Sequence, residues 1–410
     1  MTIKALAGDT QYKWVVLAVA TLAQACACFF VQGFGSIALN IKQAMLLSDW
    51  QIGLLVSAAQ LVPLAGLLVA GELLDRYSER FVVGIGTLIV GASLCGASIA
   101  SDYSILLMLF VILGLGYSTA QPGGSKSVSG WFANKHLGFA MGIRQAGLPL
   151  GGAVATLLLP YIAQRFSLQS AFFYSGLIAI AGGLFFMLLY RPPPLKSAQA
   201  KKSVNLKAAV VARLSMAKEP SMINIMMSGV CLTASQYGIS VFLVLYLYTS
   251  LELTSSLATT MFFIVLGFGV IGRIVLAAWS DQCRHGRFFP VLTCLCGAAI
   301  ALLLLPILHT SNSLILALYM AFTGFFTYGW YGPWVAYIAD SAPADRKGFA
   351  LGMAMTANQI GVVLVPPTIG LAKDALGTYS YGWYGLALLS LWVFYNTQKR
   401  AKMGAVTADR

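Results

Sequence analysis

Long apolar runs, separated by short polar breaks, occupy nearly the whole chain. A helix needs about 20 apolar residues to cross the hydrocarbon core of a bilayer. Runs such as 14–39 and 81–100 meet that length, so the pattern predicts an all-α membrane protein. The predicted spans are 14–39, 51–73, 81–100, 103–128, 137–160, 170–190, 221–248, 254–279, 288–308, 313–339, 349–371 and 379–397.

The charges of the chain are few and unevenly placed. Of its 410 residues, 59% are hydrophobic and 10% are charged, whereas soluble domains have about 25% charged residues. The net charge of +13 could suggest a nucleic-acid partner, but no basic stripe is interleaved with aromatic residues. Lys and Arg instead gather in the loops on one side of the predicted spans. Such a bias marks the cytoplasmic side, so we expect a multi-pass protein of the inner (plasma) membrane with both termini cytoplasmic.

The two halves of the chain repeat one another. The segment 138–142 (GFAMG) recurs as 348–352 (GFALG), 210 residues later. Between the halves lies the one long polar stretch, which we interpret as a cytoplasmic linker at 191–220. The sequence therefore predicts a six-helix bundle at 1–190 and a second one at 221–410, an arrangement that large transporters use.

Two loops carry a related motif at equivalent places in the halves. The loop after the second span reads GELLDRYSER, at 71–80, and the loop after the eighth reads AAWSDQCRHGR, at 277–287. With these motifs the chain resembles the major facilitator superfamily over essentially its whole length, and in character it is closest to bacterial organic-anion and monocarboxylate carriers. The first copy departs from the usual pattern at Ser78 and Glu79. The resemblance implies twelve transmembrane helices in two pseudo-symmetric bundles, which transport a substrate by alternating access.

The resemblance also implies a gate at the cytoplasmic side. Asp75 is expected to approach the start of the eleventh helix near Gly348 when that side is closed, and Asp281 is expected to do the same for the fifth helix. A helix N-terminus carries about half a positive charge, which favours an aspartate there. The alternative is that these charges are ordinary helix caps and topology signals. The residues expected to take part in conformational gating are Gly71, Asp75, Arg76, Asp281, Arg284 and Lys126.

Arg144 and Arg273 lie inside predicted spans, one in each half, while the acidic residues lie in loops, tails or at helix ends. A charge at bilayer depth costs at least about 2.5–3.5 kcal/mol and therefore faces the bundle interior or a cavity. Guanidinium groups form bidentate hydrogen bonds with carboxylates, so we expect the pair to bind an anion. Alternatively, they reach water at the membrane surface or hold backbone carbonyls. The predicted substrate-binding residues are Arg144, Arg273, Gln24, Gln32, Gln236, Tyr237, Tyr331, Asn358 and Gln359.

These features favour a carrier of a small organic anion, and among such anions a carboxylate. Efflux of amphipathic drugs or metabolites is the alternative, and it predicts an acidic residue in the cavity, which the spans do not offer. An enzyme or sensor would need a catalytic constellation, but His136, His285 and His309 sit in loops or at helix ends. We expect a monomer in the lipid bilayer with no cofactor. Substrate identity, direction of transport and coupling to protons or to a counter-substrate stay open.

Overall fold

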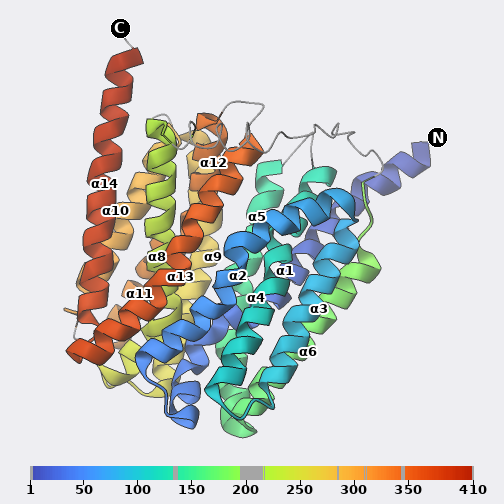
Figure 1. Ribbon diagram of the computed structural model, residues 1–410. Coiled ribbons are helices and arrows are strands. Elements are labelled where there is room, and N and C mark those ends of the chain that lie inside the picture. The colour runs from blue at the N-terminus through green and yellow to red at the C-terminus, as the bar shows by residue number, and fades with distance from the viewer. Residues whose placement is uncertain are drawn as a thin grey trace.

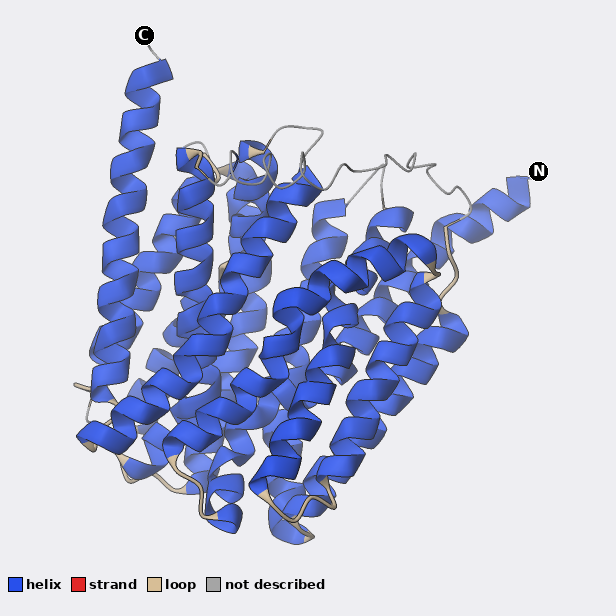
Figure 2. Cartoon of the chain, viewed as in Figure 1, coloured by secondary structure: helices blue, strands red, loops and turns tan. Residues whose placement is uncertain are grey.

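Helices are the only regular secondary structure in the described part of the chain (Figure 2). The computed structural model describes residues 3–132, 137–193, 216, 218–283, 286–308, 310, 312–342 and 347–408. Within those residues, nine helices are long and apolar enough to cross a membrane. The predicted fold class, an all-α membrane protein, is confirmed.

The first half of the chain forms six helices, and polar side chains cap the starts of four of them. Ser48 Oγ accepts from the Gln51 N–H at 3.2 Å, and the Gln51 side chain accepts from the Ser48 N–H at 2.9 Å. The Asp102 carboxylate accepts two N–H groups of the fourth helix. Each cap satisfies amides that have no partner within the helix. The helices are α1 Ile3–Met45, α2 Asp49–Arg76, α3 Glu79–Ala97, α4 Tyr103–Trp131, α5 Leu137–Arg165 and α6 Leu168–Leu189.

The second half forms six further spans, one of which is broken. The predicted span 313–339 is interrupted at Trp330. Pro333 has no N–H to donate to the carbonyl group of Gly329, four residues earlier, which explains a break at this point. The helices are α8 Pro220–Thr249, α9 Ser255–Gln282, α10 Phe288–Leu304, α11 Ser313–Gly329, α12 Tyr331–Ser341, α13 Lys347–Leu376 and α14 Ser380–Ala408.

The helices group into two bundles that follow the two halves of the chain (Figure 1). Three helix pairs join the bundles: α2 with α13, α5 with α9, and α1 with α8. Under the 210-residue repeat, the pair α9–α5 is the counterpart of α2–α13, so the interface follows the internal pseudo-symmetry. The predicted linker 191–220 falls mostly outside the described residues, and its bounds stay a prediction.

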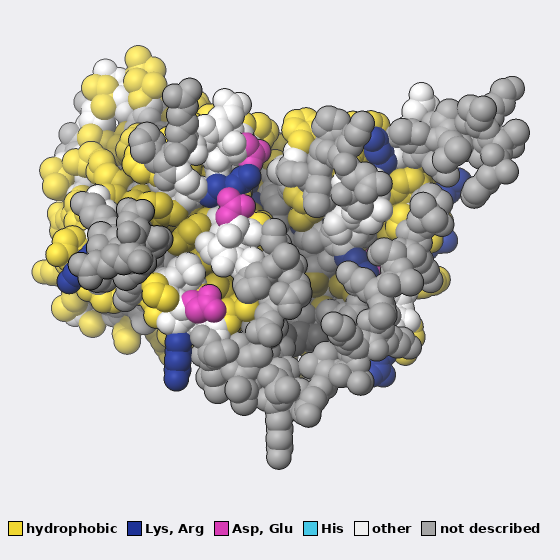
Figure 3. Space-filling view, turned by 90° about the horizontal axis from the view of Figure 1, so that it is seen from above, with side chains coloured by type: hydrophobic (Ala, Val, Ile, Leu, Met, Phe, Trp, Pro, Cys, Tyr) yellow, Lys and Arg dark blue, Asp and Glu magenta, His cyan; other side chains and the backbone are white. Residues whose placement is uncertain are grey.

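Both chain termini lie at the same end of the bundles, which we call the termini end, and we call the opposite end the far end (Figure 1). Figure 3 looks onto the termini end, where basic side chains lie around the face and acidic side chains lie beside some of them. This end also holds the two loops that carry the repeated motif, since α2 and α9 both end there. The termini end is thus the end whose basic residues led to the prediction that both termini are cytoplasmic.

The two bundles touch closely at the far end. A Cβ atom on Gly53 would lie 2.4 Å from the Pro366 carbonyl oxygen, and one on Gly370 would lie 2.3 Å from the Asp49 carbonyl oxygen, so both crossings require glycine. Near the termini end, by contrast, a Cβ atom on Gly71 or Gly352 would meet no described atom within 4 Å. Helices α2 and α13 therefore close the far end and separate toward the termini end.

A polar cluster joins the bundles at the far end. The Asp374 carboxylate, at the end of α13, accepts from the backbone N–H groups of Asp49 (3.1 Å) and Trp50 (2.8 Å) at the start of α2. The Asp49 carboxylate accepts in turn from the Tyr379 hydroxyl (2.5 Å) and pairs with Lys42 (2.6 Å). A carboxylate at a helix N-terminus is stabilised by the partial positive charge there. The cluster therefore stabilises the closed far end.

The Asp374→Asn variant is expected to open the far end more often. Losing the charge at the α2 N-terminus removes about 1 kcal/mol, which shifts the balance of closed and open states by about fivefold. Spin labels at Ser101 and Thr310, one in each half at the far end, report the change as a second, longer distance. Asp102→Asn is the matched control, because Asp102 caps α4 within one bundle. An unchanged distance distribution in Asp374→Asn would show that this cap does not hold the bundles together.

Candidate substrate-binding site

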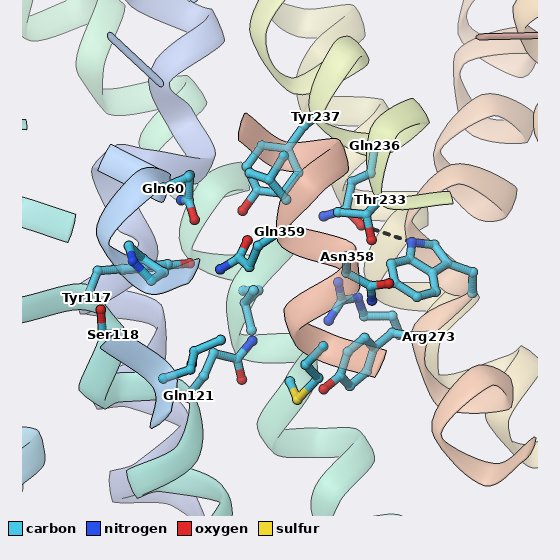
Figure 4. Close-up of a pocket in the computed structure, with 17 residues that line it drawn as sticks. Gln60, Tyr117, Ser118, Gln121, Thr233, Gln236, Tyr237, Arg273, Asn358 and Gln359 are labelled. Atoms are coloured by element: carbon cyan, nitrogen blue, oxygen red, sulfur yellow. Dashed lines mark hydrogen bonds between the residues drawn. The ribbon is translucent and has the colours of Figure 1, made fainter. Parts of the chain in front are cut away.

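A cavity lies between the two bundles, lined by helices from both of them. Figure 4 shows Gln60, Tyr117, Ser118 and Gln121 on one side and Thr233, Gln236, Asn358 and Arg273 on the other. The first group comes from α2 and α4 of the first bundle, and the second comes from α8, α9 and α13 of the second. The lining residues are Gln60, Pro63, Leu67, Tyr117, Ser118, Gln121, Leu148, Thr233, Gln236, Tyr237, Arg273, Trp330, Tyr331, Met355, Asn358, Gln359 and Val362.

Arg273 is the one charged side chain among the described residues that line this cavity. It is 4% exposed. Its Nε donates to the Tyr328 carbonyl oxygen (3.1 Å), and its Nη1 donates across the bundle interface to the Gln145 carbonyl oxygen (2.9 Å). The Tyr331 ring lies 5.6 Å from the guanidinium carbon, close enough for a cation–π contact. Nη2 makes no hydrogen bond to the described part of the chain, so it remains available for a ligand.

Several uncharged polar groups around the cavity also lack partners. Gln60 Nε2, Thr233 Oγ1 and Asn358 Oδ1 are buried without a hydrogen bond in the described structure. Other buried hydroxyls, such as those of Thr87 and Thr156, donate to the carbonyl four residues earlier. A buried polar atom without a partner costs about 1–3 kcal/mol. Asn358 Oδ1 lies against Gly229 of α8, whereas Gln60 Nε2 and Thr233 Oγ1 are candidates for contacts with a polar ligand.

Arg144 is fully buried inside the first bundle, and it is not among the residues that line the cavity. Its Nη2 donates to Gln24 Oε1 (2.7 Å) and to the carbonyl oxygens of Ala120 (3.0 Å) and Gln121 (2.8 Å). Its Nη1 donates to Ser125 Oγ (3.0 Å) and, at 3.4 Å, to Gln121 Oε1. The side chain therefore links α5 to α1 and α4.

The structure places the predicted site residues in two groups. Those on the cavity wall are Arg273, Gln236, Tyr237, Tyr331, Asn358 and Gln359. Arg144, Gln24 and Gln32 are buried away from the lining. Gln60 and Gln121 line the cavity but were not predicted to bind substrate. Each is an amide inside an apolar run, and polar residues within spans that face the interior are the signal that could have found them.

The comparisons with known proteins agree with this architecture. Residues 20–366 match the family profile described as Major Facilitator Superfamily. The chain belongs to the major facilitator superfamily. It is accordingly a membrane transporter and not an enzyme, and the resemblance inferred from its sequence motifs is confirmed.

Three relatives illustrate where the chain lies within the superfamily. An uncharacterized MFS-type transporter of Mycobacterium tuberculosis is 27% identical over 365 residues, which covers 87% of this chain and 79% of the relative. A probable 4-methylmuconolactone transporter of Cupriavidus pinatubonensis is 25% identical, covering 86% and 83%. A probable L-galactonate transporter of Escherichia coli is 27% identical, covering 69% and 66%.

Solved structures of the superfamily share the fold. A bacterial homologue of the human lysosomal transporter Spinster, in an inward-facing and occupied conformation, has a TM-score of 0.74 at 15% identity. The match covers 95% of this chain and 97% of that one. The two-bundle architecture predicted from the sequence is thus confirmed.

The superfamily's signature loop follows α2 at the termini end. Gly71, Asp75 and Arg76 lie near the end of this helix, and Arg76 donates to Glu72 Oε1 from both Nε (3.0 Å) and Nη2 (2.6 Å). The Asp75 side chain lies outside the described part of the structure. Lys126 of α4 donates to the Leu74 carbonyl oxygen (2.5 Å) at the same helix end. Lys126 thus caps α2 here, and its predicted gating role stays a prediction.

The second copy of the motif forms ion pairs within its own bundle. Arg287 Nη1 donates to the Asp281 carboxylate (2.6 Å), and Arg287 Nε donates to Asp340 (2.7 Å). Partial burial lowers the pKa of Arg287, but the two carboxylates outweigh it, so this pKa lies above its ordinary value. Arg284 lies outside the described residues. These contacts tie the end of α9 to α12, and the gating role of Asp281 stays a prediction.

Proposed function

We propose that this transporter carries a small organic anion, a carboxylate, by alternating access. The observation that carries the proposal is Arg273, a buried cation on the cavity wall with one amino nitrogen left unbonded. No carboxylate of the described lining residues neutralises it. A carboxylate of the substrate would accept a charge-assisted hydrogen bond from Nη2 and offset the cost of burying the charge.

The names of two relatives support an organic-acid substrate. One relative is a probable transporter of 4-methylmuconolactone and another of L-galactonate. The alternative, efflux of amphipathic cations, would favour an acidic side chain in the cavity, and the described lining contains none. The positive site therefore favours an anion over a cation.

Alternating access is supported by the uneven contacts between α2 and α13. The bundles pack closely at Gly53 and Gly370, whereas Gly71 and Gly352 have no described neighbour at the Cβ position. We propose that this state exposes the cavity toward the termini end. In the other half of the transport cycle, the bundles would close at the termini end and separate at the far end. A substrate shifts such an equilibrium only if it binds the states with different affinity. Arg273 offers that difference, because its Nη1 bonds to α5 across the interface.

A screen of the purified protein tests the substrate class. A ligand that binds only the folded state raises its unfolding temperature. Small carboxylates are expected to do so, whereas lipophilic cations such as tetraphenylphosphonium are expected to leave the temperature unchanged. Stabilisation by the cations alone would favour the efflux alternative.

The termini end is expected to face the cytoplasm, because the basic residues gather there. In a background lacking the seven native cysteines, Lys202→Cys should resist an impermeant thiol reagent added to intact cells. Ser101→Cys, in the loop before α4 at the far end, is the control that should react. Labelling at position 202 with protection at position 101 would reverse the orientation.

A further inference from the structure

The positive charge of the cavity lies on one side only. Arg273 belongs to the second bundle, whereas the first bundle contributes Gln60, Tyr117, Ser118 and Gln121, which are all uncharged (Figure 4). The cavity therefore offers an anion site on one wall and amides and hydroxyls on the opposite wall.

Arg144, the second buried arginine, adds no positive charge to the cavity wall. Arg144 is 0% exposed, and its two amino nitrogens make five hydrogen bonds to oxygens of Gln24, Ala120, Gln121 and Ser125. To reach a ligand it would have to give up these five hydrogen bonds, one of which is the donor that Gln24 Oε1 has in the described structure. Its hydrogen bonds to Gln121 instead hold that cavity residue in place, which makes Arg144 a positioning residue.

The unpartnered polar atoms of the wall are uncharged. Gln60 is 1% exposed, Thr233 is 6% exposed and Asn358 is 7% exposed. Gln60 Nε2 is a donor, Asn358 Oδ1 is an acceptor, and the Thr233 hydroxyl can act as either. Asn358 Oδ1 lies against Gly229 of α8, so a ligand would meet Gln60 and Thr233. Hydroxyl groups, which both donate and accept, can pair with both.

We infer that the substrate is a hydroxylated monocarboxylate, with one anionic end on Arg273 and uncharged hydroxyl groups toward the amides. This inference rests on the proposed function and narrows its substrate class. A second carboxylate would lie among neutral side chains with no cation to pair with, and burying an unpaired charge is unfavourable. An unsubstituted chain would leave the amides without partners. Both analogues should therefore bind more weakly.

Matched acids of three chain lengths test the inference on the purified full-length protein by titration calorimetry. The sets are glycerate, propionate and tartronate; threonate, butyrate and tartrate; and gluconate, hexanoate and glucarate. In the set that binds tightest, the hydroxylated monocarboxylate should bind at least about tenfold more tightly than either partner. Gln60→Leu should weaken its binding by about tenfold while leaving the unsubstituted acid within about twofold. Ser175→Ala, buried in α6 outside the cavity, is the control.

The outcomes separate this inference from the proposed function. Equal or tighter binding of the dicarboxylate, or of the unsubstituted acid, would overturn the inference and leave an organic-anion carrier standing. Binding of benzoate, added as an aromatic acid, with none of the nine matched acids would do the same. If no acid binds while a lipophilic cation does, both the inference and the proposed function fail.

Discussion

Arg273→Ala is expected to weaken binding of the substrate anion by one to two orders of magnitude. A hydrogen bond to a charged group contributes about 1.5–3 kcal/mol, and each 1.4 kcal/mol changes affinity about tenfold. Arg273→Lys keeps the charge but loses the planar fork that also reaches the Tyr328 and Gln145 carbonyl oxygens. It should therefore recover only part of the affinity. Calorimetric titration of the folded variants measures both effects.

Arg165→Ala is the matched control for the change in charge. Arg165 is exposed at the far end of α5, so its removal alters the net charge without touching the cavity. Parent-like affinity in Arg165→Ala and loss in Arg273→Ala would locate the effect in the cavity. Parent-like affinity in folded Arg273→Ala would show that Arg273 only ties α9 to its neighbours.

Arg144→Ala is expected to destabilise the first bundle more than it changes anion recognition. The substitution removes five hydrogen bonds that link α5 to α1 and α4, and it leaves Gln24 Oε1 without its donor. A buried acceptor that loses its partner costs about 1–3 kcal/mol, and a hydrogen bond to a charged group contributes about 1.5–3 kcal/mol, so we expect a loss of about 3 kcal/mol. The midpoint of unfolding in detergent should fall well below that of Arg273→Ala. Arg144→Lys should restore only part of the loss, because its ammonium has three donors in another geometry.

The sequence alone suggested a different role for Arg144, and this variant separates the two. If Arg144→Ala were as stable as the parent but bound the anion as weakly as Arg273→Ala, the two arginines would bind the substrate jointly. The contacts in the first bundle predict the opposite order of effects. Quantifying stability and affinity on the same preparation distinguishes positioning from direct contact.

The transmembrane spans could be predicted because they depend on local sequence. Each apolar run must satisfy its backbone hydrogen bonds internally, so a run of sufficient length in lipid becomes a helix. The break at Trp330 also has a local cause in Pro333, so the span 313–339, predicted as one helix, could have been predicted as two. Even the pairing of the halves follows from the 210-residue repeat. These parts of the fold need no knowledge of how the helices face one another.

The cavity wall could be predicted only in part. The depth of a residue in its span follows from the sequence, but the direction in which the helix points that side chain does not. Arg144 and Arg273 lie at similar depth in their spans, yet one points into its own bundle and the other lines the cavity. Two of the five acceptors of Arg144 are backbone carbonyls of α4, and residue type does not predict such acceptors. Gln60 and Gln121 were missed because uncharged amides are tolerated in spans more easily than charges. The cations were therefore found, but their partners were not.

Counterflow in proteoliposomes tests the central claim most directly, namely that the protein moves an organic anion held by Arg273. Liposomes with the purified parent, preloaded with the acid that binds tightest, should take up the labelled acid saturably. Liposomes with Arg273→Ala at equal protein content should show little uptake above protein-free liposomes, while Arg165→Ala should match the parent. Uptake by Arg273→Ala with the rate and KM of the parent would contradict the account.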